Sequence, residues 1–482
     1  MDGRIRAKLT KEMDAAQALG ALCLGGLSLY ALFPLVNLCR GCLGRWKVSP
    51  FFGRPDFVIP MWPIWRDYNF ALIAVLLIFL LYACLKNRLT ARSSLTAGLT
   101  AGAAKPAPFS RLIGVFRRNP AYLFLLLLGL WMIVSTAVTG LVPGSVIGSD
   151  RARTGLLMSL CFLLYFPAAL GLREEKQARR FLAVFLIAAG LVNAAIVAEY
   201  YAGAHWNLCH TGIVFYNSNH LAYYLLAETV AAGLVFVLTD RKAQQWIALA
   251  IYLFGVASLL IANTLGCLVA LVLSFVLTFI VLLLTKRFRA GRFLTLILGA
   301  GAVFLALYLV PNAAGRTLKS KVLANLRVLD ASAAALPNLG EASDSLGSGR
   351  MALWKCGFRS ALEKPLFGCG LAEMRVRLSQ ATNGKVDSVH NEFLEYATNH
   401  GLPALASYLA FCLAVFIRGA RRRLSLRPTQ IISLCAAFAY LVSSFFGVTM
   451  FYTAPYLFIL LGLGYSRDES GPGAQEKEKA AP

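Results

Sequence analysis

Residues 387–417 read DSVHNEFLEYATNHGLPALASYLAFCLAVFI, and this stretch joins a polar half to an apolar half. The apolar half begins at Leu402 and holds no charged residue before Arg418, which approaches the length of about 20 residues that a helix needs to cross a bilayer. The polar half holds two histidines, two glutamates, an aspartate and two asparagines. Ionisable groups are unfavourable at membrane depth and usually face a water-filled cavity. The stretch therefore indicates a membrane helix that begins beside a polar site.

Apolar runs of this kind recur along the whole chain. It has 482 residues, 58% of them hydrophobic, and a mean hydropathy of +0.65, which soluble domains rarely reach. The runs predict an all-α polytopic membrane protein with about twelve transmembrane helices. Their expected centres are Leu27, Leu77, Leu130, Leu163, Gly190, Thr229, Phe254, Phe275, Val303, Ala410, Ala437 and Leu457.

The basic residues between the runs predict the orientation of the chain. If the N-terminus is cytoplasmic, the cytoplasmic segments hold 29 of the 47 Lys and Arg residues and the short outer loops hold 7. The other 11 lie in the long segment 311–390, and long segments contribute little to the positive-inside rule. We therefore expect an inner-membrane protein with both termini in the cytoplasm. The net charge of +24 then reflects topology rather than binding to nucleic acid.

The spacing of the runs divides the chain into four parts. Residues 1–310 carry the first nine predicted transmembrane helices, and residues 391–465 carry the last three. Residues 311–390 form one long extracytoplasmic loop that contains amphipathic helices. Residues 466–482 are polar and are expected to form a disordered cytoplasmic tail.

One segment of the long loop, GRMALWKCGFRSALEKPLFGCGL at 349–371, has helical periodicity. It predicts an amphipathic helix that lies on the membrane surface and ends before Pro365. Arg350 stands at the start of this helix, where a guanidinium can bind phosphate through two parallel hydrogen bonds. The predicted apolar face consists of Met351, Trp354, Phe358, Ala361 and Leu362.

The polar half of the first stretch predicts a helix with one polar face, which we expect to line a cavity. Side chains three and four residues apart share a helix face. Another interpretation of the same pattern is a helix cap at a wet interface. The face consists of Glu392, Glu395 or Tyr396, and Asn399, with His390 and Asn391 at the N-terminal end of the helix.

Three motifs of the long loop and its neighbour occur in a recognisable order: GRMALW at 349–354, PLFGCGL at 365–371 and SVHNEFLEYATNHGLPAL at 388–405. Together they resemble the O-antigen ligase and O-antigen polymerase superfamily. An earlier segment, FYNSNHLAYYL at 215–225, resembles an asparagine-containing motif of the same family. The resemblance extends roughly over residues 181–465.

The resemblance implies a metal-independent glycosyltransferase with a GT-C-like architecture and no cofactor. Such a protein transfers or polymerises a glycan from an undecaprenyl-pyrophosphate carrier to an acceptor hydroxyl at the outer face of the cytoplasmic membrane. Its partners would be the lipid-linked glycan donor, a glycan, lipid or protein acceptor, and membrane lipids.

The resemblance also assigns roles to individual residues. His390 matches the catalytic histidine of the family and Arg350 matches an arginine that binds the pyrophosphate. Glu392 or Glu395 is expected to hold the histidine ring. Asn217 and Asn219 are candidates to bind sugar hydroxyls, or to cap the helix that follows them.

The chain departs from the family pattern at Leu265. The family often has Ser-Arg-Gly where this chain has Thr264-Leu265-Gly266, so a second arginine at the pyrophosphate is missing. We expect that another cation replaces it, that the donor differs, or that activity is reduced. The candidate replacements are Arg316, Lys319, Arg375 and Arg377.

Three alternatives stay open at this point. The pattern does not distinguish a ligase from a polymerase, nor does it specify the sugar, the acceptor or the oligomeric state. A transporter or flippase would favour internal repeats and broken helices, and no clear repeat is visible in the sequence. A non-catalytic scaffold is consistent with the missing arginine. Finally, the spacing of His205 and His210 allows a metal pair.

Overall fold

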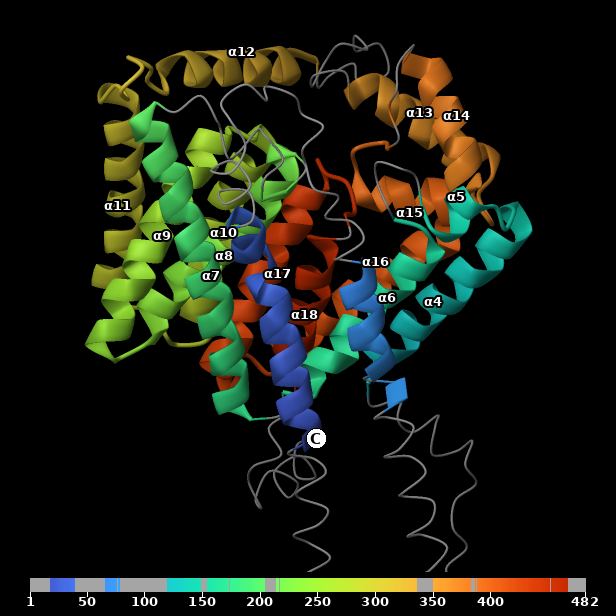
Figure 1. Cartoon of the computed structure of the whole chain (residues 1–482), viewed down its shortest axis with the longest axis horizontal. Coiled ribbons are helices and arrows are strands. Elements are labelled where there is room, and N and C mark those ends of the chain that lie inside the picture. Colours follow the sequence, from blue (N-terminus) through green and yellow to red (C-terminus); the bar gives the residue numbers. More distant parts are fainter. Residues whose placement is uncertain are drawn as a thin grey trace, which may run out of the picture.

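The computed structural model describes residues 18–39, 66–75, 77–78, 119–148, 154–172, 174–203, 214–215, 217–335, 350–382, 386, 388–450 and 452–466. In these ranges every regular element is a helix, as Figure 1 shows. By length and composition, eight of the described helices can cross a membrane. The chain is therefore a multi-pass membrane protein.

The helices fall into three groups. The eight long apolar helices are Ala18–Cys39, α4 (Pro120–Thr139), α7 (Glu175–Ala202), α8 (Ser218–Leu238), α9 (Lys242–Ala262), α10 (Leu265–Leu284), α11 (Ala290–Leu309) and α16 (Leu402–Arg421). Three shorter apolar helices are α6 (Leu156–Leu170), α17 (Pro428–Ser444) and α18 (Ala454–Tyr465). Besides the helix at residues 66–75, the others are α5 (Pro143–Val146), α12 (Lys319–Ala335), α13 (Arg350–Glu363), α14 (Gly370–Thr382), α15 (Glu392–His400) and the short η3 (Arg423–Ser425).

The expected number of spans is not confirmed, although each of the twelve expected centres lies in a helix. Three of those helices have only 15, 17 and 12 residues, which is short for a complete crossing. The helix around Leu77 continues into residues outside the described ranges. The disordered tail that we expect at 466–482 also lies almost wholly outside them.

The core of the molecule is built around α8, which is buried over 89% of its most apolar window. A helix that is hydrophobic on every side has no preferred outer face and is expected in the centre of a bundle. Tyrosine and phenylalanine rings fill the space beside it, and Tyr224 packs against Phe185, Phe215 and Tyr456. By contrast, α11 is only 17% buried over the corresponding window, and it exposes leucines where lipid chains would lie.

Polar contacts gather the basic connections at one end of this bundle. Arg289 forms a 2.6 Å ion pair with Asp240, and Arg287 donates to the Leu426 carbonyl at 2.9 Å. Arg427 lies 3.6 Å from Glu175. In Figure 1 the helices α12, α13 and α14 lie at the opposite end, with α12 across the top of the bundle. The segments that we expect in the cytoplasm thus share an end, away from the described part of the long loop.

Helices α13, α14 and α15 form a small unit with an apolar core of its own. The helix predicted in this segment ends at Glu363, as the proline signal indicates, and it has a second face that packs inside the protein. Phe358 and Leu362 are 59% and 74% exposed. The face that is buried carries small residues because α13 packs closely on α15. It consists of Leu353, Gly357, Ser360 and Ala361.

The PLFGCGL motif holds the C-terminal end of α15. The Pro365 carbonyl accepts a hydrogen bond from the Leu402 amide, and the Cys369 amide donates to the Thr398 carbonyl, both at 2.7 Å. Gly401 lies at φ +85°, and a Cβ there would overlap the Leu366 carbonyl. The close contact between Gly401 and the Leu366 carbonyl directs the chain from α15 into the membrane helix α16.

Candidate functional site

His390 occupies an unusual backbone position directly before α15. Its φ is +54°, in the left-handed region that few residues other than glycine adopt. Residues in such conformations persist where their surroundings hold them, and they cluster at functional sites. The Asn391 side chain accepts a hydrogen bond from the Leu394 amide at 3.0 Å, so Asn391 caps the helix. The capping interpretation therefore applies to Asn391 and leaves the His390 side chain outside the cap.

A short relay of hydrogen bonds holds this turn. The His390 amide donates to the Ser388 hydroxyl oxygen at 2.9 Å, and that hydroxyl donates to Glu395. Glu395 also accepts from the Thr449 amide at 3.2 Å. Glu395 thus contacts the histidine's backbone through Ser388, whereas we expected a carboxylate to hold the imidazole ring. The relay fixes the direction in which His390 leaves the chain.

Glu392 is almost completely buried, at 1% exposure, behind the same helix turn. Its Oε1 accepts a hydrogen bond from the Tyr408 hydroxyl of α16 at 2.8 Å. Burial raises the pKa of Glu392 to about 8 and that of Glu395 to about 7. At neutral pH, Glu392 is therefore mostly protonated, which keeps a negative charge away from the apolar interior.

His390 stands close enough to Arg350 for the guanidinium charge to affect its ring. Burial, together with the smaller effect of the Arg350 charge, lowers the pKa of His390 to about 4. The imidazole is therefore neutral at pH 7 and has a nitrogen lone pair available as a hydrogen-bond or proton acceptor. The fold brings these residues together across 40 positions of sequence, with Arg350 at the start of α13 and His390 at the start of α15.

The starts of α8 and α10 join the same cluster. The Thr264 hydroxyl, at the start of α10, donates to the Asn219 side chain at 3.2 Å. Arg350 interacts electrostatically with Cys267, two residues beyond Leu265. The guanidinium of Arg350 therefore acts on the turn where the family pattern has its second arginine.

His220 belongs to this cluster, although we did not select it as a site residue. It is buried at 7% exposure, its Nδ1 lies 2.6 Å from the Tyr452 hydroxyl, and its ring interacts electrostatically with His390. Tyr452 and Thr449 lie in the connection between α17 and α18. Polar residues between the last two expected spans are the sequence signal that could have indicated this contribution.

A cavity of about 200 Å³ lies beside α15. Glu395, Tyr396 and Asn399 line it, as the shared helix face predicts, whereas Glu392 turns instead to Tyr408. His400 lines it too, but its Nδ1 lies 2.8 Å from the Ser135 hydroxyl, which ties α15 to α4. The lining also includes Arg375, so one of the proposed replacement cations lies near the helix.

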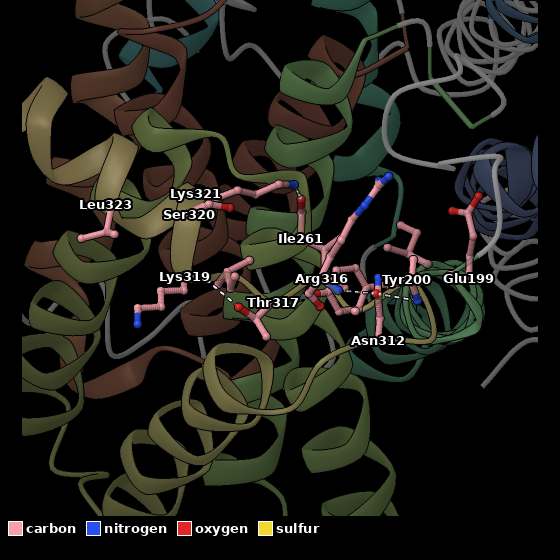
Figure 2. Close-up of a pocket in the computed structure, with 15 residues that line it drawn as sticks. Glu199, Tyr200, Ile261, Asn312, Arg316, Thr317, Lys319, Ser320, Lys321 and Leu323 are labelled. Carbon is pink, nitrogen blue, oxygen red and sulfur yellow. Dashed lines mark hydrogen bonds between the residues drawn. The ribbon is translucent and has the colours of Figure 1, made fainter.

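The other candidates occupy different positions. Arg377 forms ion pairs with Glu363 at 2.5 Å and with Glu373 at 2.9 Å, which uses its charge within the α13–α14 unit. Asn217 caps α8 by accepting from the Asn219 amide at 2.8 Å. Arg316 and Lys319 line a separate cavity of about 910 Å³, drawn in Figure 2.

The described part of the chain contains no group of three or more His, Cys, Asp or Glu side chains arranged to hold a metal ion. His205 and His210, the histidines with a spacing that allows a metal pair, lie outside the described residues.

The fold and the cluster define a class of protein. It is a multi-pass membrane protein in which a histidine, an arginine and buried carboxyl groups meet at the end of the bundle that carries α12–α15.

Comparison with known proteins identifies the family within this class. Residues 248–409 match the family model described as O-antigen ligase, and this match includes Arg350 and His390. This segment of the chain therefore matches the O-antigen ligase superfamily that its motifs suggest. The match is shorter than the resemblance over 181–465 and leaves out the segment 215–225. No curated protein matches the chain.

Proposed function

We propose that this protein transfers a glycan from an undecaprenyl-pyrophosphate carrier to an acceptor hydroxyl, at the outer face of the cytoplasmic membrane. The observation that carries the proposal is the pairing of His390 with Arg350 inside the segment that matches the O-antigen ligase family. The inner membrane and the cytoplasmic termini are part of the proposal, and they follow from the distribution of Lys and Arg.

The proposed reaction requires a proton acceptor and a group that stabilises the leaving pyrophosphate. The acceptor oxygen bonds to the anomeric carbon of the donor sugar. The bond from that carbon to the pyrophosphate oxygen breaks, and its electron pair leaves with the lipid. The proton of the acceptor hydroxyl passes to the neutral ring of His390. A bound pyrophosphate would offset the charge of Arg350 and so raise the basicity of this ring when substrate is present.

Arg350 has the chemistry to bind the departing group. Its guanidinium can donate two parallel hydrogen bonds to phosphate oxygens and stabilise the charge that develops on them. Arg350 acts on the start of α10, where this chain has Leu265 in place of the arginine of the family pattern. This position supports Arg350 as the cation at that turn. We assign no metal and no cofactor to the reaction.

Two neighbouring functions compete with this one. Polymerisation uses the same chemistry, and only the acceptor differs, because a polymerase transfers to a growing polysaccharide and a ligase to another molecule. A transporter or flippase of lipid-linked or small solutes is less well supported, because the match to the O-antigen ligase family includes both His390 and Arg350.

The test is a lipid-linked glycan transfer assay with purified variants. Asn adopts left-handed backbone conformations, so His390→Asn keeps the turn and removes the base. We expect it to lower turnover by about 10²- to 10⁴-fold, the usual scale of general acid–base catalysis, with donor binding little changed. Arg350→Ala is expected to abolish transfer, and Arg350→Lys to restore it only partly because the planar fork is lost.

Arg359→Gln is the matched control. Its side chain lies on the same helix as Arg350, is 83% exposed and pairs with Glu363 on the surface. This variant should retain transfer and show that loss of one positive charge on α13 is tolerated. Wild-type turnover by His390→Asn would remove the catalytic role, and wild-type turnover by Arg350→Ala would remove the clamp.

A further inference from the structure

The 910 Å³ cavity is separate from the His390 cluster, and none of its lining residues belongs to that cluster. It lies where the C-terminal ends of α7 and α9 meet residues 312–323, which lead into α12. Its volume is in the range of cavities that bind small molecules. The lining combines apolar side chains with hydroxyl and amide groups and three basic residues, Arg316, Lys319 and Lys321.

The basic side chains differ in what they contact. The Lys321 ammonium donates to the Ile261 carbonyl at the end of α9 at 2.9 Å. Among the described residues, neither the Arg316 guanidinium nor the Lys319 ammonium has a hydrogen bond or an ion pair. Figure 2 shows Arg316 projecting to the same side as Glu199, the one carboxylate of the described lining, and Lys319 pointing away from both. Three cations against one carboxylate leave the cavity with a net positive charge.

The start of α12 adds to this positive potential, whereas the C-terminal ends of α7 and α9 at the same cavity oppose it. Helix α12 begins at the cavity, and its first turn holds Lys319 and Lys321 but no acidic residue. A helix N-terminus favours negative charge, so lysines at this position are locally unfavourable. An unfavourable arrangement of charges beside a cavity indicates a functional constraint. A bound anion would relieve the repulsion between the lysines and the helix N-terminus.

The loop that presents Arg316 is held by its own hydrogen bonds. The Asn312 side chain accepts from the Ala314 and Arg316 amides, both at 3.0 Å, and the Ala313 amide donates to the Tyr201 carbonyl of α7 at 3.0 Å. The guanidinium is therefore carried by an ordered turn attached to the bundle. Such preorganisation reduces the conformational entropy that a ligand must overcome on binding.

We propose that this cavity is a binding site for a phosphate-bearing ligand, with Arg316 as its principal charged contact and with Lys319 adding to its positive potential. The ligand is either a soluble sugar phosphate or the phosphate headgroup of a membrane lipid, which share the chemistry that the site recognises. The site is distinct from the donor clamp at Arg350. The proposal does not depend on glycan transfer, because binding is measured without turnover.

The experiment measures binding by the full-length protein in nanodiscs. In phosphatidylcholine nanodiscs, titration with glucose 1-phosphate tests the soluble source and glucose serves as the neutral comparison. In a second arm, native mass spectrometry measures how much phosphatidic acid the protein retains from mixed nanodiscs. The variants are Arg316→Gln with Lys319→Gln, and Arg423→Gln as a control on an exposed residue of η3.

We expect at least one phosphate probe to bind, and glucose not to bind. The double variant should weaken that binding at least about tenfold, because each charge-assisted hydrogen bond contributes roughly as much as a tenfold change in affinity. Arg423→Gln should bind as the wild type does. The Arg316 and Lys319 side chains are exposed, so the thermal midpoint of the double variant should equal that of the wild type.

The outcomes separate the two ligand sources. Binding of glucose 1-phosphate assigns the site to a sugar phosphate, and loss of phosphatidic acid retention alone assigns it to a lipid headgroup. The proposal is overturned if neither probe binds or if the double variant binds both as the wild type does. Equal loss in Arg350→Ala would instead make the cavity part of the donor site.

Discussion

At the scale of single residues, the site depends on groups that the interior keeps neutral. Burial holds the proton on Glu392 and lowers the proton affinity of His390, so at neutral pH both side chains are mostly uncharged. Arg350 then supplies the positive charge beside His390. This arrangement suits the binding of an anionic leaving group, because the raised pKa values of Glu392 and Glu395 reduce the negative charge near it.

The raised pKa of Glu392 makes the stability of the protein depend on pH. In the unfolded chain a glutamate titrates near 4.3, whereas in the fold Glu392 keeps its proton up to a pKa of about 8. Between these values the folded state binds more protons, so the free energy of unfolding falls as pH rises. We expect the thermal midpoint of the wild type to decrease from pH 5 to pH 8.5, by an amount to which Glu392 contributes.

Glu392→Gln is the variant that isolates this contribution. Its amide oxygen can still accept the Tyr408 hydroxyl, but the side chain no longer titrates. We expect a shallower decrease of the midpoint with pH, with Glu395 accounting for part of the remainder. A wild-type slope in Glu392→Gln would show that Glu392 does not carry the proton, and light scattering would check that aggregation does not produce the slope.

At the scale of helices, the site depends on how closely α13 approaches α15. A Cβ at Gly357 would lie 2.7 Å from Leu394 and 3.1 Å from Val389, so these helices meet at a residue without a side chain. This contact sets the distance between Arg350 at the start of one helix and His390 before the other. The sequence pattern predicted an amphipathic surface helix here, and the tight contact explains why the face that packs on α15 carries small residues.

We therefore predict that Gly357→Val weakens both the fold and transfer. The added methyl groups overpack the contact, which typically costs about 1–3 kcal/mol. We expect a lower thermal midpoint and at least about a tenfold loss of turnover if the helices separate. The control is Gly301→Val in α11, where a new Cβ meets nothing within 4 Å. Equal effects of both substitutions would mean that the loss reflects valine in a helix and not the α13–α15 contact.

At the scale of the whole molecule, the two ends of the bundle differ in chemistry. The ion pairs and hydrogen bonds of Arg287, Arg289 and Arg427 join the basic connections at one end. Helix α12 and the unit of α13–α15 lie at the other end, as Figure 1 shows, and the 910 Å³ cavity lies at the start of α12. Glycan transfer at the outer face requires that this second end be extracytoplasmic.

Cysteine labelling in intact cells checks this orientation. Ser320 in α12 and Ser425 in η3 are both exposed and lie on opposite sides of the predicted membrane. In a background without the eleven native cysteines, we expect an impermeant maleimide to label Ser320→Cys in intact cells. Ser425→Cys should react only after permeabilisation. The reverse result would place His390 on the cytoplasmic side and exclude the proposed reaction.

The sequence by itself determined the membrane class, the helical architecture and the family. Apolar runs longer than about 17 residues have few folded solutions, because in lipid the backbone must satisfy its own hydrogen bonds. The motif around His390 also indicated the site, since so many polar groups beside a membrane helix need a reason to be there. These inferences rest on local composition and order, which a sequence displays directly.

Only the tertiary structure decided which residues meet. The contact of His220 with Tyr452 spans 232 positions, and the hydrogen bond from Thr264 to Asn219 joins two helix starts 45 positions apart. The structure also assigned the cap to Asn391 and connected Glu395 to the histidine's backbone through Ser388. Helix periodicity shows which side chains share a face, but the neighbour that covers that face is set by packing between distant segments.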